Sequence, residues 1–155
     1  MRRALEINPS LQAFQIEYVA LLADEGKLEE ALAYLDSCTR CDARAASLMR
    51  QSIEHARTPS GSFVYGDALR GTFGDYVFRG LAGGDELVLA RLEEATAAGE
   101  LVPLAINNRA IAGIRHTPRY EALVRATGLD DYWRAHGWPN FCEPTQGQQF
   151  RCRGR

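Results

Sequence analysis

A chain of 155 residues with 46% hydrophobic and 25% charged residues has the length and composition of one globular domain. The formal net charge of −2 provides no basic field, so neither nucleic acid nor an anionic membrane is expected as a partner. Lys27 is the single lysine among the 18 basic side chains, and it follows Gly26 in a predicted turn. Schiff-base and phosphate-loop mechanisms, which need a well-placed lysine, are therefore not expected.

Membrane and secretion signals are not visible in the sequence. No apolar run approaches the ~20 residues that a membrane span needs. The chain reaches Glu6, Asn8 and Pro9 too early for the apolar core of a signal peptide. We therefore expect no membrane segment and a cytoplasmic location.

The first part of the chain has the apolar spacing of consecutive helices. Residues 2–8 are predicted to end a helix at Pro9, after which a second helix covers 11–23. Gly26 is predicted to form the turn to a third helix over 28–41. The apolar residues that recur at helical spacing over the second helix are Leu11, Phe14, Tyr18, Leu21 and Leu22.

The remaining elements are predicted mainly from the residues at their ends. Thr117 is a predicted N-cap, with Pro118 at the first helical position. Composition predicts a loop over 58–62, a break at the glycines of 80–84 and a disordered tail over 142–155. The helices predicted in this part are 43–57, 63–79, 85–98, 118–127 and 130–136.

A repeat of 34 residues relates two segments of the sequence. Residues 4–9 recur as residues 38–43, so that Pro9 corresponds to Ala43. Each copy has a small residue, an apolar residue three positions later and a polar turn. A helix–turn–helix period of 34 residues is typical of tetratricopeptide solenoids.

Residues 4–42 resemble the tetratricopeptide repeat family in their turn and packing positions. Gly26 matches the turn between the two helices, and Ala31 and Leu35 match the small and bulky positions of the second helix. Residues 63–99 match more loosely, as a degenerate helical pair. The sequence departs from the family pattern at Gln15, Val19 and Ala43.

The resemblance implies an all-α fold and an interaction surface. The expected fold is a right-handed helical solenoid of about seven or eight helices over 1–141, capped by 117–141. Ligand peptides of the family lie in a concave groove, and its positions here are small or apolar, which favours an apolar helix or extended peptide as the partner. The groove residues carried over are Ala13, Ile16, Ala20, Ala23 and Asp24.

The C-terminal part has a second resemblance. It is similar to the C-terminus of bacterial repeat proteins whose N-terminal part is a winged-helix regulator or a nucleotide cyclase. The segments that carry it are 117–123, 128–129, 132–134 and 137–139, followed by Cys142. This resemblance implies a C-terminal scaffold or sensor module of a bacterial regulator, or a stand-alone relative of one.

The N-terminal half-repeat lacks a partner helix. Residues 2–8 would leave an apolar stripe of Ala4, Leu5 and Ile7 uncovered. We expect this edge to be closed by self-association into a homodimer, or by a preceding part of a longer chain.

The cysteines allow two interpretations each. The spacing Cys38-x-x-Cys41 is compatible with a thiol site, but the repeat places both cysteines on the packing stripe, which favours small buried hydrophobes. Cys142 and Cys152 could form a disulfide in an oxidising compartment. We favour free thiols for them, because a helical repeat domain of this size needs no crosslink.

Other candidate chemistry is sparse. The three histidines are scattered, and neighbouring acidic pairs do not face each other on a helix, so no metal, cofactor or catalytic dyad is expected. Tyr132, Trp133 and Trp138 could stack a ligand, but such aromatics more often cap a helical stack. The sequence therefore predicts a non-catalytic protein-interaction scaffold, with a small-molecule sensor near these aromatics as the alternative.

Overall fold

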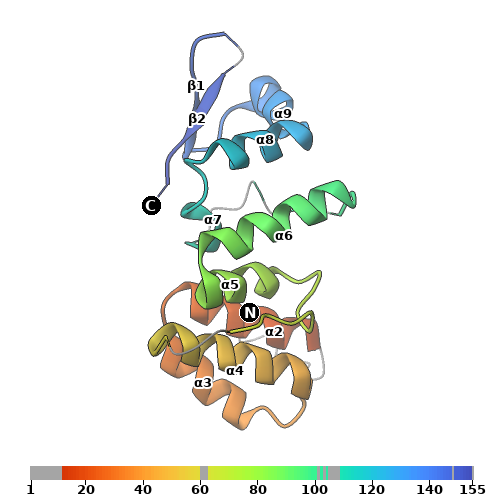
Figure 1. Ribbon diagram of the computed structural model, residues 1–155, viewed down its shortest axis with the longest axis vertical. Helices are drawn as coiled ribbons and strands as arrows, with labels where there is room; N and C mark the ends of the chain where they lie inside the picture. The colour runs from red at the N-terminus through yellow and green to blue at the C-terminus, as the bar shows by residue number, and fades with distance from the viewer. Residues whose placement is uncertain are drawn as a thin grey trace. The chain divides into compact units, whose positions relative to one another are not determined.

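The structure is a computed structural model that describes residues 12–59, 63–100, 102, 104, 109–147 and 149–154, of which Gln12 and Ala13 have a described backbone only. These residues form eight helices and one two-stranded sheet (Figure 1). The described residues are mostly helical with one small sheet, which agrees with the predicted all-α class. The chain divides into two compact units, Met1–Gly84 and Asp85–Arg155.

The first unit contains four described helices. The turn predicted at Gly26 is present, with φ of 79° at that residue. The amide of Lys27 donates to the carbonyl of Leu22 at 2.8 Å and that of Gly26 to Ala23 at 3.0 Å, a Schellman motif that ends the first of the four. The helices are α2 (Gln12–Asp24), α3 (Leu28–Ser37), α4 (Ala43–Arg57) and α5 (Phe73–Gly83).

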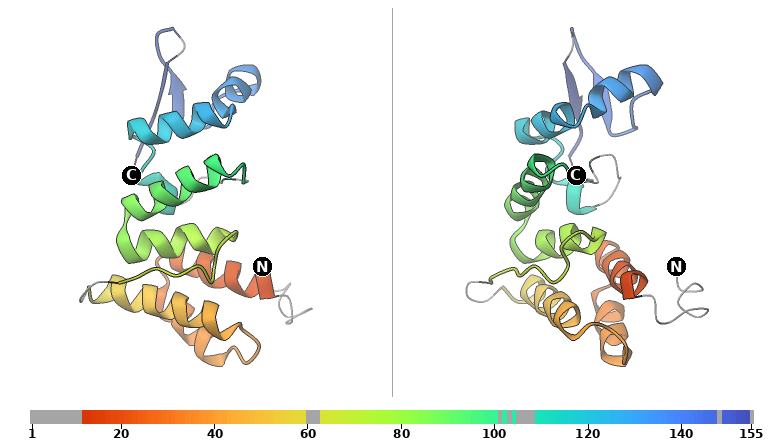
Figure 2. Two further views of the ribbon diagram at one scale, coloured as in Figure 1. Left: turned by 45° about the vertical axis from the view of Figure 1, so that its right-hand side comes forward. Right: turned by 90° about the vertical axis from the view of Figure 1, so that its right-hand side faces the viewer.

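The four helices close on one another rather than continuing as an open stack. Helix α5 packs against both α2 and α4, and α3 packs against the same two helices (Figure 2). Gly74 permits the close approach of α5, because a Cβ there would lie 3.0 Å from Ile16 Cγ2 and 3.5 Å from Ala20 Cβ. The core between the helices consists of buried side chains such as Val19, Leu35, Met49, Ile53 and Phe78.

The helix predicted over 63–79 is wrong in its first half. Residues 63–72 form a connection, and α5 begins after Thr72, whose side chain accepts from the amide of Asp75 at 3.2 Å. Gly71 has φ of 82°, a left-handed conformation that a helix interior cannot contain. The predicted break at the glycines of 80–84 is also displaced, because α5 continues to Gly83 and ends at Gly84.

The second unit places a hairpin beside four helices. Thr117 caps α8 as predicted, accepting from the amide of Tyr120 at 3.2 Å, with Pro118 as the first helical residue. The predicted disordered tail is wrong in the described part, because Cys142–Pro144 (β1) and Phe150–Cys152 (β2) pair as antiparallel strands. The helices are α6 (Asp85–Ala97), α7 (Arg109–Ala112), α8 (Pro118–Ala126) and α9 (Leu129–His136).

Helix α8 is the centre of the second unit, packing against α6 and α9. Its buried Tyr120 donates its hydroxyl to the carbonyl of Leu104 at 2.6 Å, and burial raises the pKa of Tyr120 to about 12. Its Arg119 reaches α6, with Nη1 2.8 Å from Glu86 Oε2 and Nη2 2.7 Å from Glu93 Oε2. Helix α5 belongs to the first unit and α6 to the second, so the boundary between the units falls within the pair expected over 63–99.

Candidate functional site

An apolar face on α2 is the most prominent candidate surface of the first unit. Phe14 and Leu21 are 40% and 38% exposed, and they belong to the small group of large hydrophobic side chains that are exposed among the described residues. Tyr18 lies between them, so the three residues stand at i, i+4 and i+7 on one side of the helix. We call these three residues the α2 face.

The α2 face continues toward α3 through a ring contact. The rings of Tyr18 and Tyr34 have centroids 5.0 Å apart and planes at 71°, an edge-to-face arrangement. Burial raises the pKa of Tyr34, so its hydroxyl stays protonated and neutral near pH 7. The two tyrosine rings therefore extend the α2 face onto α3, with the charged Lys27 close to Tyr18.

The apolar stripe of the sequence divides between the core and the surface. Its Leu22 is buried, whereas Phe14 and Leu21 are exposed. Val19 and Ala20, which lie outside the stripe, are buried as well. Helix α2 has apolar residues almost all round, so periodicity could not decide which side faces the core. The one signal in the sequence is that α2 has more apolar residues than one side of a helix can bury, which indicates that some of them must be exposed.

The predicted concave groove is closed within the first unit. Ala20 and Ala23 are 0% and 4% exposed, and Ile16 is half-buried against Gly74 of α5. Glu17 also joins the two helices, since its Oε1 accepts from the amide of Phe73 at 3.0 Å.

The groove prediction therefore needs correction for these residues, because α5 occupies the space that a partner was expected to fill. Asp24 is half-buried at the end of α2. The side chain of Ala13 lies outside the described residues, as do all atoms of Ala4, Leu5 and Ile7 at the expected self-association edge.

A buried ion pair fixes the connection that precedes α5. Asp75 is fully buried, and its Oδ1 accepts from Arg79 Nε at 2.8 Å. The Arg79 guanidinium lies 4.4 Å from the ring centre of Tyr65, whose hydroxyl donates to the Asp75 carbonyl at 3.2 Å. Burial raises the pKa of Tyr65. Each charged group meets its partner here, so the cluster holds the chain in place.

The C-terminal aromatics form the core of the second unit. Trp133 is 4% exposed and meets Phe141 and Phe150 edge-on, at 6.5 and 6.3 Å between ring centroids. Trp138 lies on Phe150 at 5.4 Å, whereas Tyr132 is 59% exposed. The rings of Trp133, Trp138, Phe141 and Phe150 therefore pack on one another.

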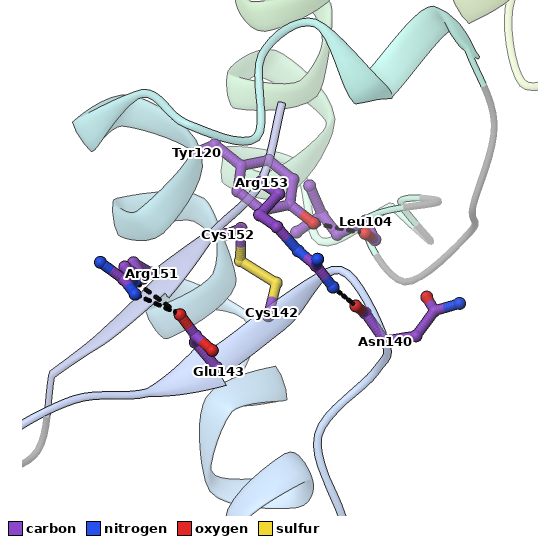
Figure 3. Close-up of a disulfide and its surroundings, with 8 residues drawn as sticks. All are labelled: Leu104, Tyr120, Asn140, Cys142, Glu143, Arg151, Cys152 and Arg153. Carbon is purple, nitrogen blue, oxygen red and sulfur yellow. Dashed lines mark hydrogen bonds and ion pairs between the residues drawn. A yellow bond between two sulfur atoms is a disulfide. The ribbon is translucent and has the colours of Figure 1, made fainter. Parts of the chain in front are cut away.

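All four cysteines are paired, which overturns the prediction of free thiols. Cys142 and Cys152 face each other in the hairpin and form a disulfide (Figure 3). On the outer side of the same strands, Arg151 Nε donates to Glu143 Oε1 at 2.6 Å. The sequence could not show this pairing, because it depends on the turn that brings residues 142 and 152 opposite each other.

Cys38 and Cys41 also form a disulfide and do not belong to a helix stripe. Helix α3 ends at Ser37, and Asp42 caps α4 by accepting from the amide of Ala45 at 2.8 Å. The repeat had placed both cysteines at packing positions, but the polar sequence between them forms the connection between the two helices.

Metal and membrane sites receive no support among the described residues. No group of three or more His, Cys, Asp or Glu side chains in that part of the chain is arranged to hold a metal ion. None of the described helices combines the length and apolar character that crossing a bilayer requires. Comparison with protein-family models, with curated proteins and with solved structures finds no match to this chain.

Proposed function

We propose that this chain is a non-catalytic protein-interaction module whose α2 face binds the apolar side of an amphipathic helix. The observation that carries the proposal is the exposure of Phe14 and Leu21, 40% and 38%, on one side of a helix whose other sides are packed. Aromatic and aliphatic side chains gathered on one helix face are the anchors that helix–helix recognition uses.

The geometry favours a helix over an extended peptide as the partner. The α2 face covers the eight residues 14–21, or about 10 Å along the helix axis, which matches two turns of a partner helix. A partner with apolar residues at i, i+4 and i+7 would place its ridge along the row of Phe14, Tyr18 and Leu21.

The sequence resemblances supply the biological setting of the proposal. Residues 4–42 resemble a tetratricopeptide repeat, and the C-terminal segment resembles the end of bacterial regulators with winged-helix or cyclase parts. We propose that the chain is the C-terminal scaffold of such a regulator. The two disulfides favour an oxidising compartment over the expected cytoplasm, where thiols are kept reduced.

A labelled model peptide tests the proposal directly. The probe is a synthetic amphipathic helix of leucine, alanine, lysine and glutamate, with leucines at i, i+4 and i+7, followed by fluorescence anisotropy. We expect binding that Phe14→Asp and Leu21→Asp each weaken at least about tenfold, as for an interface hot spot. The matched control is Val64→Asp, because Val64 is 86% exposed but lies outside the α2 face.

The outcomes separate the partner from a second copy of the chain. Equal binding by the wild type and Phe14→Asp would contradict the proposal. Light scattering on the same variants shows whether the wild type is a dimer that Phe14→Asp dissociates. That result would keep the α2 face as an interface and make a second copy its partner, on a different surface from the edge of Ala4, Leu5 and Ile7 at which the homodimer was expected.

A further inference from the structure

The connection between α3 and α4 is closed by a disulfide that lies near the surface. Cys38 is the C-cap of α3, and Cys41 immediately precedes Asp42, the N-cap of α4. The bond joins Cys38 to Cys41 over a Cα–Cα distance of 5.6 Å. Both cysteines are half-buried, whereas Thr39, Arg40 and Asp42 around them are exposed. The disulfide is therefore partly accessible to a thiol from solution.

The second disulfide lies in a different environment. Cys142 and Cys152 are only 6% and 7% exposed, and the neighbouring Phe141 and Phe150 are buried as well. The hairpin pairs the two cysteines directly, and the amide of Arg153 donates to the Phe141 carbonyl at 2.8 Å beside them. Burial excludes an attacking thiol, and strand pairing holds the two sulfurs together after any reduction.

We propose that Cys38–Cys41 is a thiol–disulfide exchange site for small anionic thiols of the glutathione class, whereas Cys142–Cys152 is a structural crosslink. Exposed disulfides are more easily reduced than buried ones, because the attacking thiolate must reach a sulfur atom. The proposed exchange site does not depend on the α2 face, so an experiment that disproves one of the two proposals leaves the other unaffected.

The exchange is a two-electron reaction with the external thiol as reductant. A thiolate RS⁻ attacks one sulfur of the Cys38–Cys41 bond, forming a mixed disulfide, and the electron pair of the broken bond goes to the other cysteine, which takes up a proton. A second RS⁻ attacks the sulfur of R and releases the remaining cysteine as a thiolate, which is also protonated. The cystine is reduced to two thiols, and two RSH are oxidised to RSSR.

The charge between the two cysteines favours an anionic thiol. Arg40 is exposed and stands between Cys38 and Cys41 in the sequence. A nearby guanidinium attracts an anionic thiol such as glutathione and stabilises the thiolate that leaves. Asp42 carries the opposite charge, but it caps α4 by accepting from the amide of Ala45 at 2.8 Å, so the positive end of that helix offsets part of its charge.

Opening this bond leaves the rest of the first unit intact. The N-cap of α4 does not use either cysteine, and Ala31, Leu35 and Ala45 are buried in the helix contacts on both sides of the connection. Reduction therefore frees only the short connection, so the exchange needs no unfolding.

The test is a redox titration of the full chain. The protein is equilibrated in buffers of graded reduced and oxidised glutathione, quenched with acid and alkylated, and each cysteine is quantified by peptide mass spectrometry. We expect Cys38–Cys41 to be half-reduced at a ratio of [GSH]² to [GSSG] at least about tenfold lower than the ratio that half-reduces Cys142–Cys152. Each tenfold step in this ratio corresponds to about 30 mV. Circular dichroism in the same buffers should keep its helical signal.

Variants distinguish an exchange site from a disulfide that merely opens. Arg40→Gln should slow the reaction with glutathione severalfold and leave the reaction with neutral 2-mercaptoethanol unchanged. In the double variant Cys142→Ser/Cys152→Ser, Cys38–Cys41 should still be reduced at the same glutathione ratio as in the wild type. The proposal is overturned if both pairs titrate together, if Cys38–Cys41 is reduced only when helical signal is lost, or if Arg40→Gln affects both thiols equally.

Discussion

Phe14 and Leu21 lie two turns apart on the same side of α2, and both are exposed while Val19 and Leu22 of the same helix are buried. A helix that is apolar almost all round has more hydrophobic surface than its neighbours in the first unit cover. The α2 face is the part that the neighbouring helices leave exposed.

The packing of α5 on α2 predicts the effect of a methyl group at Gly74. A Cβ there would lie 3.0 Å from Ile16 Cγ2 and 3.5 Å from Ala20 Cβ. Overpacking of this kind costs about 1–3 kcal/mol, against a gain of about 1 kcal/mol from replacing a helical glycine. Gly74→Ala should therefore lower the free energy of unfolding, as measured by urea titration.

Gly66 provides the matched control for this substitution. No heavy atom lies within 4 Å of a Cβ built there, and its φ is not positive. Gly66→Ala should leave the stability unchanged or raise it slightly. Equal losses in both variants would mean that α5 does not approach α2 as closely as the structure shows.

The aromatic core of the second unit predicts a large loss on truncation of Trp133. The ring is 4% exposed and meets Phe141 and Phe150, so Trp133→Ala should cost about 3–5 kcal/mol of unfolding free energy. Tyr132→Ala, at a neighbouring residue that is 59% exposed, should change it little. Near-ultraviolet circular dichroism should lose its aromatic bands in the first variant alone.

The ion pairs of Arg119 predict a pH-dependent link between α6 and α8. The hydrogen bond from Arg119 lowers the pKa of Glu93 below its ordinary value of 4.5. A carboxylate with a lowered folded-state pKa stabilises the fold above pH 4.5, and this contribution is lost as the pH falls through the lower value. Arg119→Gln should lower the free energy of unfolding at pH 7. Below pH 4.5, this free energy should then fall less steeply with decreasing pH than in the wild type.

The size of this effect should be small and sensitive to salt. The side chains of Arg119 and Glu93 are 41% and 42% exposed, so water and ions screen the pair. Chemical denaturation between pH 3 and pH 7, with and without added salt, measures the difference. An identical pH profile in the wild type and Arg119→Gln would show that the pair contributes nothing.

Local signals in the sequence predicted the helix ends well. Gly26, Thr117 with Pro118, and Gly137 each end or begin a helix where expected, because capping depends on a few consecutive residues. The start of α5 differs from the prediction, although Gly71, with its positive φ, and Thr72, with its capping side chain, are local signals for it.

Features that depend on distant contacts were not predictable. The closure of α5 onto α2 decides which side of α2 is buried, and no pattern within α2 encodes it. The hairpin and its disulfide depend on the pairing of Cys142 with Cys152 across a turn. The predicted groove and free thiols failed for this same reason.

The most direct test of the central claim is a map of where an amphipathic helix binds. ¹⁵N-labelled full-length chain is titrated with the leucine-bearing model peptide, and amide shifts are followed by NMR. The α2 face predicts the largest shifts at residues 14–21 and around Tyr34, and their loss in Leu21→Asp but not in Val64→Asp. Shifts centred elsewhere, or shifts that persist in Leu21→Asp, would contradict the account.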